Sequence, residues 1–458
     1  MEILVNVGYL IASVCFIVAI KCLSSPRRAV VGNLIGAFGM LVAVVAVLRS
    51  DALHPPINWT AIGIGLIVGT ILGALLARTV RMTAMPQMVA LLNGFGGAAS
   101  ALVASAELLN GAAGADMLVP VALSILIGGL TFTGSLIAFA KLQELMSGRP
   151  ITYPMQKTVN ALMLVAAVAL SVMLVREPGN MTVFYAICAL SLALGVTAVI
   201  PIGGADMPVV ISLLNSYSGM AACATGFVLR NNALIISGSL VGASGIILTA
   251  IMCKAMNRSL ANVLFGAFGS APAEAASTTA GGVYKSVTPD DAAMIFDAAK
   301  LVIVVPGYGM AVAQAQHVIR EFADQLAARG TTVKYAIHPV AGRMPGHMNV
   351  LLAEANVSYD AMVEMDAINP QFAEADVALV IGANDVVNPD ARTNKSSPIY
   401  GMPILDVDKA GTVIVSKRSM RPGFAGIDNP LFYNPKTSML FGDAKESVGK
   451  LITAMKEL

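Results

Sequence analysis

The chain has 458 residues, of which 56% are apolar and only 12% are charged, whereas soluble domains carry about 25% charged residues. The formal net charge of +2, with no dense basic tract, argues against a nucleic-acid partner. Long apolar runs fill the chain as far as about Cys253, and from about Asp290 the composition is that of a soluble domain. The sequence therefore predicts a membrane part followed by a water-soluble part.

Nine apolar segments in the first part are each close to the roughly 20 residues that a helix needs to cross a bilayer. We predict spans at 3–23, 29–48, 59–77, 87–107, 118–140, 159–175, 182–202, 209–229 and 234–253. Glycines at four-residue spacing predict close helix packing; they are Gly32/Gly36, Gly65/Gly69/Gly73 and Gly238/Gly242. None of the five cysteines has metal-ligand spacing, and we interpret them as packing residues rather than as part of a metal site.

Basic residues between the spans predict the orientation, because cytosolic loops of membrane proteins are enriched in Lys and Arg. The loops after the first, third and fifth spans carry Lys21, Arg27, Arg28, Arg78, Arg81, Lys141, Arg149 and Lys157. The opposite loops carry only Arg49, Arg176 and Arg230. We therefore expect a multi-pass protein whose N-terminus lies outside and whose C-terminal domain is cytosolic.

A few polar residues lie inside the predicted spans, where each is costly and faces a partner or a cavity. They are Asn93, Thr131, Thr133, Ser135, Asn215 and Ser216. At 1.5 Å per residue, Asn93 and Asn215 lie roughly 9 Å inside the cytosolic boundary. Two interpretations stay open: interhelical hydrogen bonds, or a water-lined proton path through Asn93, Thr131, Ser135, Asn215 and Ser216.

No Asp, Glu, Lys or Arg lies in the middle of a predicted span. No span contains His, which excludes haem held by membrane histidines, and Asp206 lies in a predicted cytosolic turn. If protons cross here, the group that binds them is expected to come from another chain.

Small residues at 259–288 predict a flexible linker between a transmembrane domain, 1–258, and a soluble domain, 289–458. A helix is expected to begin after Thr288, which is followed by Pro289 and two acids. Predicted strands at 301–305, 333–337, 361–365, 377–381, 412–416 and 438–441 alternate with helices. This pattern predicts a Rossmann-like, doubly wound parallel α/β sheet after the transmembrane bundle.

The first strand of this domain leads into a glycine-bearing turn and a long amphipathic helix that we expect to reach about Arg329. The turn and first helical residues are Gly307, Tyr308, Gly309, Met310, Ala311 and Val312. Between strand and helix this GxGxxV pattern favours a dinucleotide site, in which Gly307 makes the turn and Gly309 admits the pyrophosphate. A glycine-rich turn without a ligand is the alternative.

The position of charge suggests which nucleotide is bound. An NAD site has an acid at the end of the second strand, but here that strand ends in Ile337, His338 and Pro339. Instead Lys417, Arg418 and Ser419 follow the fifth strand and could hold a 2′-phosphate, unless they form a solvated basic turn.

A 2′-phosphate at that place would lay the dinucleotide across the sheet in the reversed sense, with its nicotinamide towards strands one and two. Arg343, between Gly342 and Pro345, could then meet the pyrophosphate. His347 is expected to be structural rather than an acid or base.

Long motifs resemble those of proton-translocating NAD(P) transhydrogenase beta subunits. They occupy 203–210 and 215–219 in the membrane part, and 307–316, 338–355, 382–385, 417–420 and 440–445 in the soluble part. The resemblance implies a reversed NADP(H) site in which Lys417, Arg418 and Ser419 hold the 2′-phosphate. It also implies that 307–312 and Arg343 lie along the pyrophosphate.

By the same resemblance, Asp385 lies near the nucleotide in the coupling region. Asp206, in its predicted cytosolic turn, is our second coupling candidate, and we expect no side chain to be catalytic. Gly423 and Phe424 match a loop that closes over the nucleotide. Many family members have Tyr in place of Phe424 and a membrane His in place of Asn93. A partner helix is therefore expected to supply a His beside Asn93.

The implied activity is that of a Re/Si-specific, proton-translocating NAD(P)⁺ transhydrogenase in a bacterial cytoplasmic (inner) membrane. Hydride would pass between NADH on an alpha-type subunit, which has its own membrane helices, and NADP⁺ on this chain. A dimer of the αβ unit is expected. The alternatives are an ion transporter or channel with an NADP-sensing regulatory domain and, less favoured, a haem or flavin membrane reductase.

Overall fold

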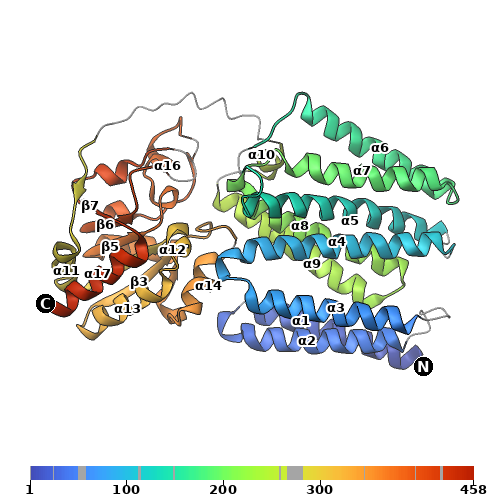
Figure 1. Cartoon of the computed structure of the whole chain (residues 1–458), viewed down its shortest axis with the longest axis horizontal. Helices are drawn as coiled ribbons and strands as arrows, with labels where there is room; N and C mark the ends of the chain where they lie inside the picture. The colour runs from blue at the N-terminus through green and yellow to red at the C-terminus, as the bar shows by residue number, and fades with distance from the viewer. Residues whose placement is uncertain are drawn as a thin grey trace. The chain divides into compact units, whose positions relative to one another are not determined.

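The computed structural model describes residues 2–23, 25–49, 58–111, 115–147, 150–256, 259–265, 282–344, 346–397, 399–422 and 427–458. Two compact units divide the chain, Met1–Ala250 and Ile251–Leu458. Figure 1 shows a first unit of long helices and a second unit built on a sheet. Pro345, Gly423 and Phe424, three of the predicted nucleotide-site residues, lie outside the described residues.

The described part of the first unit contains nine helices that are long and apolar enough to cross a membrane, which confirms the predicted spans. They are α1 (Glu2–Leu23), α2 (Pro26–Leu48), α3 (Trp59–Thr79), α4 (Met85–Leu109), α5 (Ala115–Leu142), α6 (Gln156–Arg176), α7 (Met181–Val199), α8 (Met207–Val228) and α9 (Asn232–Ala255). The short helix η2 (Gly204–Asp206) lies directly before α8.

Helices α4, α5, α7 and α8 form the core of this unit, and their backbones approach closely at glycines (Figure 1). A Cβ atom at Gly97 would lie 2.7 Å from the Gly128 carbonyl oxygen, and one at Gly195 would lie 2.1 Å from Thr133 Oγ1. The same holds between α8 and α9, where a Cβ at Gly238 would lie 2.5 Å from the Cys223 nitrogen. Small residues at these points let the helices pack backbone to backbone.

Helix α3 differs from the other eight because none of its residues is buried. A Cβ atom at Gly65, Gly69 or Gly73 would meet no neighbouring atom within 4 Å. The close packing that this glycine series predicts is therefore not made with any described residue of this chain.

A seven-stranded sheet organises the second unit, and every pair of neighbouring strands is parallel. Its strands are β1 (Lys285–Ser286), β2 (Leu301–Pro306), β3 (Thr332–Ile337), β4 (Met362–Glu364), β5 (Val377–Ile381), β6 (Thr412–Lys417) and β7 (Thr437–Phe441). The order is β1-β7-β6-β5-β2-β3-β4. Counted from β2, this is the 3-2-1-4-5-6 order of a doubly wound dinucleotide fold, which confirms the predicted class.

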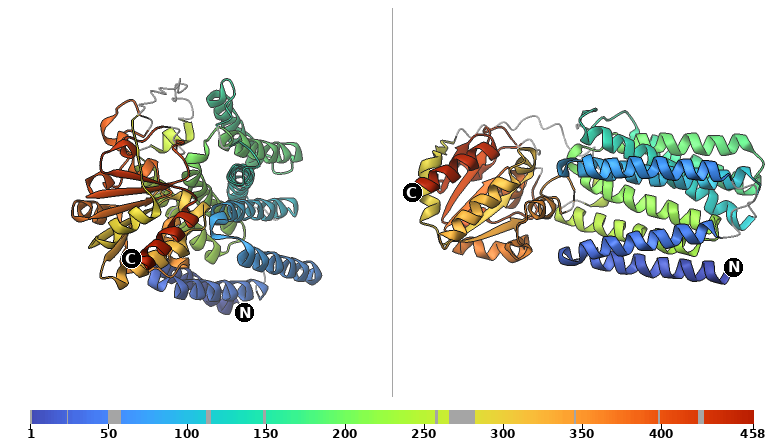
Figure 2. Two further views of the ribbon diagram at one scale, coloured as in Figure 1. Left: turned by 60° about the vertical axis from the view of Figure 1, so that its left-hand side comes forward. Right: turned by 60° about the horizontal axis from the view of Figure 1, so that its bottom comes forward.

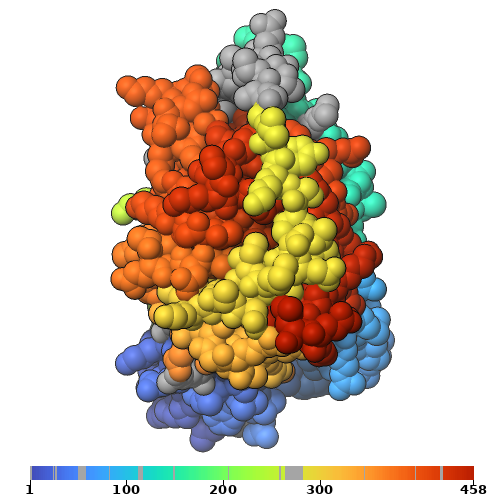
Figure 3. All heavy atoms as spheres, turned by 90° about the vertical axis from the view of Figure 1, so that its left-hand side faces the viewer, coloured from blue at the N-terminus to red at the C-terminus, as the bar shows by residue number. Residues whose placement is uncertain are grey.

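Helices α11 (Pro289–Asp297), α13 (Gln316–Ala328) and α17 (Ala444–Glu457) pack against one another over one face of the sheet (Figure 2). Figure 3 shows yellow α11 beside red α17 on the surface. Helix α11 begins where predicted, because the Thr288 hydroxyl accepts the Asp291 N–H at 3.2 Å. The other face is covered by a buried apolar cluster that includes Ile303, Phe372 and Phe432.

The long helix expected after the glycine turn is broken in two. Helix α12 (Tyr308–Val312) ends before α13 begins at Gln316. The break follows from Gln314, whose φ of +51° is incompatible with a continuous right-handed helix. The segment 259–288 contains α10 (Leu260–Phe265) and β1; the domain boundaries themselves stay a prediction.

Candidate functional site

The point where the sheet reverses its winding lies between β2 and β5, and ligands of doubly wound folds bind outside the carboxyl ends of the strands there. The Gly307 N–H donates to the Ile381 carbonyl and the Gly309 N–H to the Gly382 carbonyl, both at 2.9 Å. A Cβ at Gly307 would lie 2.3 Å from the Gly382 oxygen. The turn after β2 and the loop after β5 are thus in backbone contact.

Gly382 completes this contact and was not among the predicted site residues. Its φ is +67°, and a Cβ atom there would lie 2.2 Å from the Met310 nitrogen. Both its conformation and its neighbours therefore require glycine. The available sequence signal was its place directly after a buried strand.

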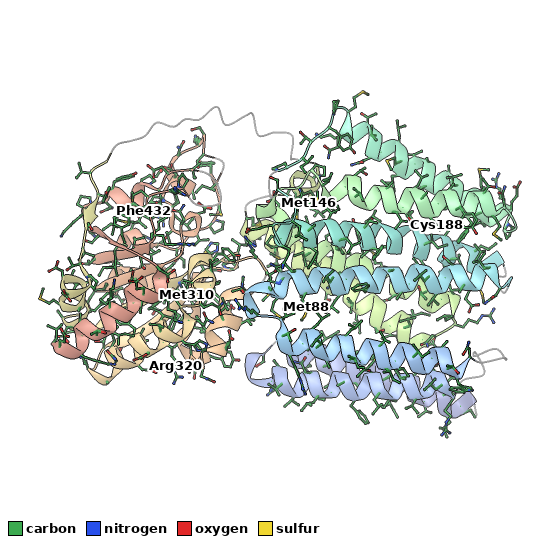
Figure 4. The ribbon with its side chains drawn as sticks, viewed as in Figure 1. Met88, Met146, Cys188, Met310, Arg320 and Phe432 are labelled. Carbon is green, nitrogen blue, oxygen red and sulfur yellow. The ribbon has the colours of Figure 1, made fainter. Side chains whose placement is uncertain are left out.

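The six residues of the predicted turn divide by the direction of their side chains. Met310, labelled in Figure 4, and Ala311 are fully buried, so their side chains belong to the interior of the unit. Val312 is exposed and Tyr308 is half-buried. Because the N–H groups of Gly307 and Gly309 bond to the loop after β5, the turn offers a ligand the Tyr308 ring and the half-buried Gly309.

Arg343 lies against this turn. Its guanidinium carbon is 4.5 Å from the centre of the Tyr308 ring, a cation–π contact between the loop after β3 and the turn after β2. Gly342, next to it, has a φ of +106°. The structure thus brings two of the predicted pyrophosphate contacts together.

A second group of charged residues lies at the carboxyl ends of β5 and β6, which are neighbours in the sheet. The Lys417 amino group donates to the Arg421 carbonyl oxygen at 2.7 Å and lies 4.6 Å from the centre of the Phe432 ring, labelled in Figure 4. Burial lowers the pKa of Lys417, while the charges of Asp385 and Asp428 oppose that shift. The structure therefore brings Asp385 within electrostatic reach of Lys417.

The two other residues of the predicted phosphate site follow Lys417. Arg418 is exposed and Ser419 is half-buried. Cations and a hydroxyl in this arrangement offer charge-assisted hydrogen bonds to an anion, with Arg343 as a further cation in the same unit.

Three asparagines and an aspartate join the loop after β5 to the segment from 427 onwards. The Asn429 amide is fully buried and donates to the Asn384 carbonyl at 3.0 Å. The Asn388 amide donates to the Asp428 carbonyl at 2.9 Å. The Asp428 carboxylate accepts a hydrogen bond from the Tyr433 hydroxyl at 2.8 Å. Burial, and to a smaller extent this carboxylate, raise the pKa of Tyr433. Of these residues, only Asn384 lies in a motif that the sequence analysis identified, at 382–385.

In the membrane unit, the polar residues proposed for a proton path are mostly buried and several join helices. Asn93, on α4, donates from its amide to the Ile211 carbonyl on α8 at 3.1 Å. The Ser216 hydroxyl donates to the Gly242 carbonyl on α9 at 2.7 Å. The Thr131 hydroxyl donates within its own helix to Ile127 at 2.6 Å. These contacts agree with the interhelical hydrogen-bond interpretation for Asn93 and Ser216.

Ser135 is the exception in this group. It is fully buried on α5, and its hydroxyl has no hydrogen-bond partner among the described residues. A Cβ atom at Gly94, next to Asn93, would lie 3.1 Å from the Ser135 Cβ. Ser135 therefore lies at the contact between α4 and α5, against Gly94. Asn215 is half-buried on α8.

The described residues contain no group of three or more His, Cys, Asp or Glu side chains that could hold a metal ion. Asp206, the second coupling candidate, ends η2 directly before α8.

Comparison with known proteins gives concordant results. Residues 5–454 match the family model described as NAD(P) transhydrogenase beta subunit. The chain is 51% identical over 459 residues to a protein named NAD(P) transhydrogenase subunit beta from Rhodospirillum rubrum, with 98% of each chain covered. A protein of the same name from a defined strain of that species matches to the same extent.

Proposed function

The chain belongs to the family of NAD(P) transhydrogenase beta subunits, and we propose that it is the NADP(H)-binding, proton-translocating subunit of a Re/Si-specific enzyme. Hydride passes between NADH on a partner and NADP⁺ on this chain, giving NAD⁺ and NADPH, and is coupled to proton passage through the membrane unit. The nine apolar helices make it a membrane protein.

The observation that carries the nucleotide proposal is that the glycine turn, Arg343 and the Lys417 segment all lie at or after the carboxyl ends of strands of one parallel sheet, on both sides of its switch point. Lys417, Arg418 and Ser419 bind the 2′-phosphate, and the turn at 307–312 lies along the pyrophosphate together with Arg343. The residues fit this ligand because the carboxyl end of β3 carries no acid for a ribose 2′-hydroxyl. There His338 is buried, with Nε2 2.8 Å from the Pro403 carbonyl oxygen.

In this mechanism the chain binds and orients the nucleotide and contributes no acid, base or nucleophile. NADP(H) itself supplies the nicotinamide carbon that accepts or gives the hydride. Proximity and exclusion of water then account for the rate. Gly342 and Pro345 belong to the pyrophosphate loop of this proposal, and Gly423 and Phe424 to the loop that closes over the nucleotide.

Lys417→Ala in the complete enzyme tests the site. Loss of a charge-assisted hydrogen bond, about 1.5–3 kcal/mol, should raise the KM for NADP(H) roughly 10- to 150-fold and leave the KM for NADH unchanged. The matched control is Lys450→Ala, since Lys450 pairs with exposed Glu446 on α17. An unchanged KM for NADP(H) in the first variant would reject the site.

The proton part of the proposal depends on a partner. An amide does not titrate, so Asn93 orders the path with Thr131, Ser135, Asn215 and Ser216 while an alpha-subunit His beside Asn93 binds the proton. Asp385 and Asp206 couple the redox state of the nucleotide to proton binding. This coupling requires a part of the protein with two conformations, whose equilibrium both the nucleotide and the proton shift. Full proton pumping after each membrane His of the partner has been replaced would refute this assignment.

The remaining proposals concern the assembly. We place the chain in a bacterial cytoplasmic membrane, N-terminus outside and soluble unit in the cytosol, because the basic residues gather in the loops on one side. An alpha-type subunit with its own membrane helices binds NAD(H), and two αβ units form the dimer.

A further inference from the structure

His347 is buried at the first position of α14 (His347–Glu354), in the loop that carries Arg343. Only 1% of its surface is exposed. Its Nδ1 accepts the backbone N–H of Arg343 at 2.9 Å. Because Nδ1 is the acceptor, the neutral ring carries its proton on Nε2. Burial, with the nearby charge of Arg343, lowers the pKa of His347 to about 4, so this form is the one present at neutral pH.

The loop is folded around this imidazole. Gly342 has a φ of +106°, and a Cβ atom there would lie 2.5 Å from His347 Nδ1 and 2.6 Å from its Cβ. The ring thus occupies the space that a side chain at 342 would need. The hydrogen bond and the glycine together fix the backbone on both sides of the Gly342–Arg343 peptide.

The same ring is linked to the glycine turn. The centres of the His347 and Tyr308 rings are 6.1 Å apart, and the Arg343 guanidinium lies over the Tyr308 ring. His347, Arg343 and Tyr308 therefore form one connected unit between the loop after β3 and the turn after β2.

The environment of His347 Nε2 indicates which property of the imidazole the loop uses. Nε2 is buried and has no hydrogen-bond partner among the described residues, a state that disfavours histidine over an apolar ring of similar size. What an apolar ring cannot supply is the acceptor for the Arg343 N–H. The hydrogen bond at Nδ1, rather than the bulk of the ring, is the property that the loop requires.

We infer that His347 is a positioning residue for the nucleotide: it holds the backbone of Arg343 so that the guanidinium, seated on Tyr308, meets the pyrophosphate of NADP(H). The inference rests on the proposed function. His347 does not itself contact the nucleotide, and it acts through Arg343.

Two replacements of His347 test the roles of its two ring nitrogens separately. His347→Asn places an amide oxygen near the position of Nδ1 and can still accept the Arg343 N–H. His347→Gln places its amide near Nε2 and leaves that N–H unpaired. Each variant is made in the full chain assembled with its partner in membranes, and the dissociation constants of NADPH and of 2′-AMP are measured.

His347→Gln should weaken NADPH binding about tenfold, and His347→Asn should restore it to within about threefold of the wild type. Neither should change the binding of 2′-AMP, which carries the 2′-phosphate and no pyrophosphate. In an Arg343→Ala background, His347→Gln should have no further effect on NADPH.

Equal losses for NADPH and 2′-AMP would mean that the ring only supports the fold, and would overturn the inference. So would unchanged NADPH binding in His347→Gln, or an additive loss in the Arg343→Ala background. Should His347→Gln fail to assemble, comparing His347→Asn with the wild type on both ligands still decides: a tenfold NADPH loss overturns the inference. A wild-type enzyme that binds NADPH no better than NADH would instead refute the proposed function.

Discussion

At the scale of single residues, two neutral histidines organise the loop that follows β3. His338 Nδ1 accepts the Val340 N–H at 3.3 Å, and His347 Nδ1 accepts the Arg343 N–H. Burial is the main cause that lowers the pKa of each to about 4. Both rings therefore hold the loop as acceptors, a role that protonation would abolish.

These shifts predict how stability depends on pH. Below about pH 6.5 the unfolded chain binds a proton at each histidine, while the folded chain does so only near pH 4. Stability of the soluble unit should therefore fall as pH drops from about 6.5 to 4, by up to about 3 kcal/mol per histidine. Amide hydrogen exchange in β2 and β3 of the full chain measures it. His347→Asn should remove that residue's share of the slope, and an unaltered slope in this variant would contradict the assignment.

Gly382 gives a second prediction at this scale. Gly382→Ala adds a Cβ atom 2.2 Å from the Met310 nitrogen at a φ of +67°, and should cost at least about 1–3 kcal/mol. NADPH binding should be lost with it, because the turn must move away. Gly449→Ala is the control, since nothing lies within 4 Å of that site on α17. If the two variants bind NADPH with the same affinity, the contact between the turn after β2 and the loop after β5 does not matter for the site.

The site residues that could be predicted were those with a local signature. Gly307 and Gly309 stand between a buried strand and a helix, and Lys417 ends a strand. Asn388 and Asn429 could not be assigned in this way. Their roles arise from contacts across the sheet edge, such as that of Asn429 with Asn384, and no local pattern records such a pairing.

At the scale of elements, the helices of the membrane unit were predictable because hydropathy is a local property, whereas their partners were not. Helix α3 carries a series of glycines at four-residue spacing, whereas α7 carries a single glycine, Gly195. Yet Gly195 on α7 is pressed against α5, and Gly69 on α3 meets no described residue. Spacing alone does not distinguish a packed glycine from an unpacked one.

This difference is testable. Gly195→Ala should destabilise the bundle by about 1–3 kcal/mol, because its Cβ would lie 2.1 Å from Thr133 Oγ1 and 2.3 Å from the Leu130 carbonyl oxygen. Gly69→Ala should leave the stability of the isolated chain in detergent unchanged. Thermal unfolding of both variants is the measurement. Equal destabilisation by the two changes would show that α3 packs within this chain after all.

In the soluble unit, the break between α12 and α13 and the short strand β1 were not predictable from the apolar periodicity of the sequence. The apolar pattern continues from Met310 to Leu326, and therefore predicted one helix. The left-handed conformation of Gln314 breaks it, and the Ala315 N–H returns to the Met310 carbonyl at 3.0 Å. Strand β1 was missed because two residues, Lys285 and Ser286, are too short for any periodic signal.

At the scale of the whole molecule, the described residues form a single parallel sheet with one switch point. One such fold binds one dinucleotide. The proposed direct hydride transfer needs two nicotinamides close together, so we expect another chain to supply the second. On the proposed function, the nine spans and the parallel-sheet domain of the described residues therefore depend on assembly with a partner for their chemistry.

The chain reconstituted alone in liposomes should therefore bind NADPH yet transfer no hydride from NADH to an NADP⁺ analogue. Adding the NAD(H)-binding partner should start both hydride transfer and proton movement, since both sites then act in one complex. The partner alone is the control and should bind NADH without transferring hydride to the analogue. Reduction of the analogue by NADH with this chain alone would mean that a second nicotinamide binds here, and the division of labour between two subunits would have to be abandoned.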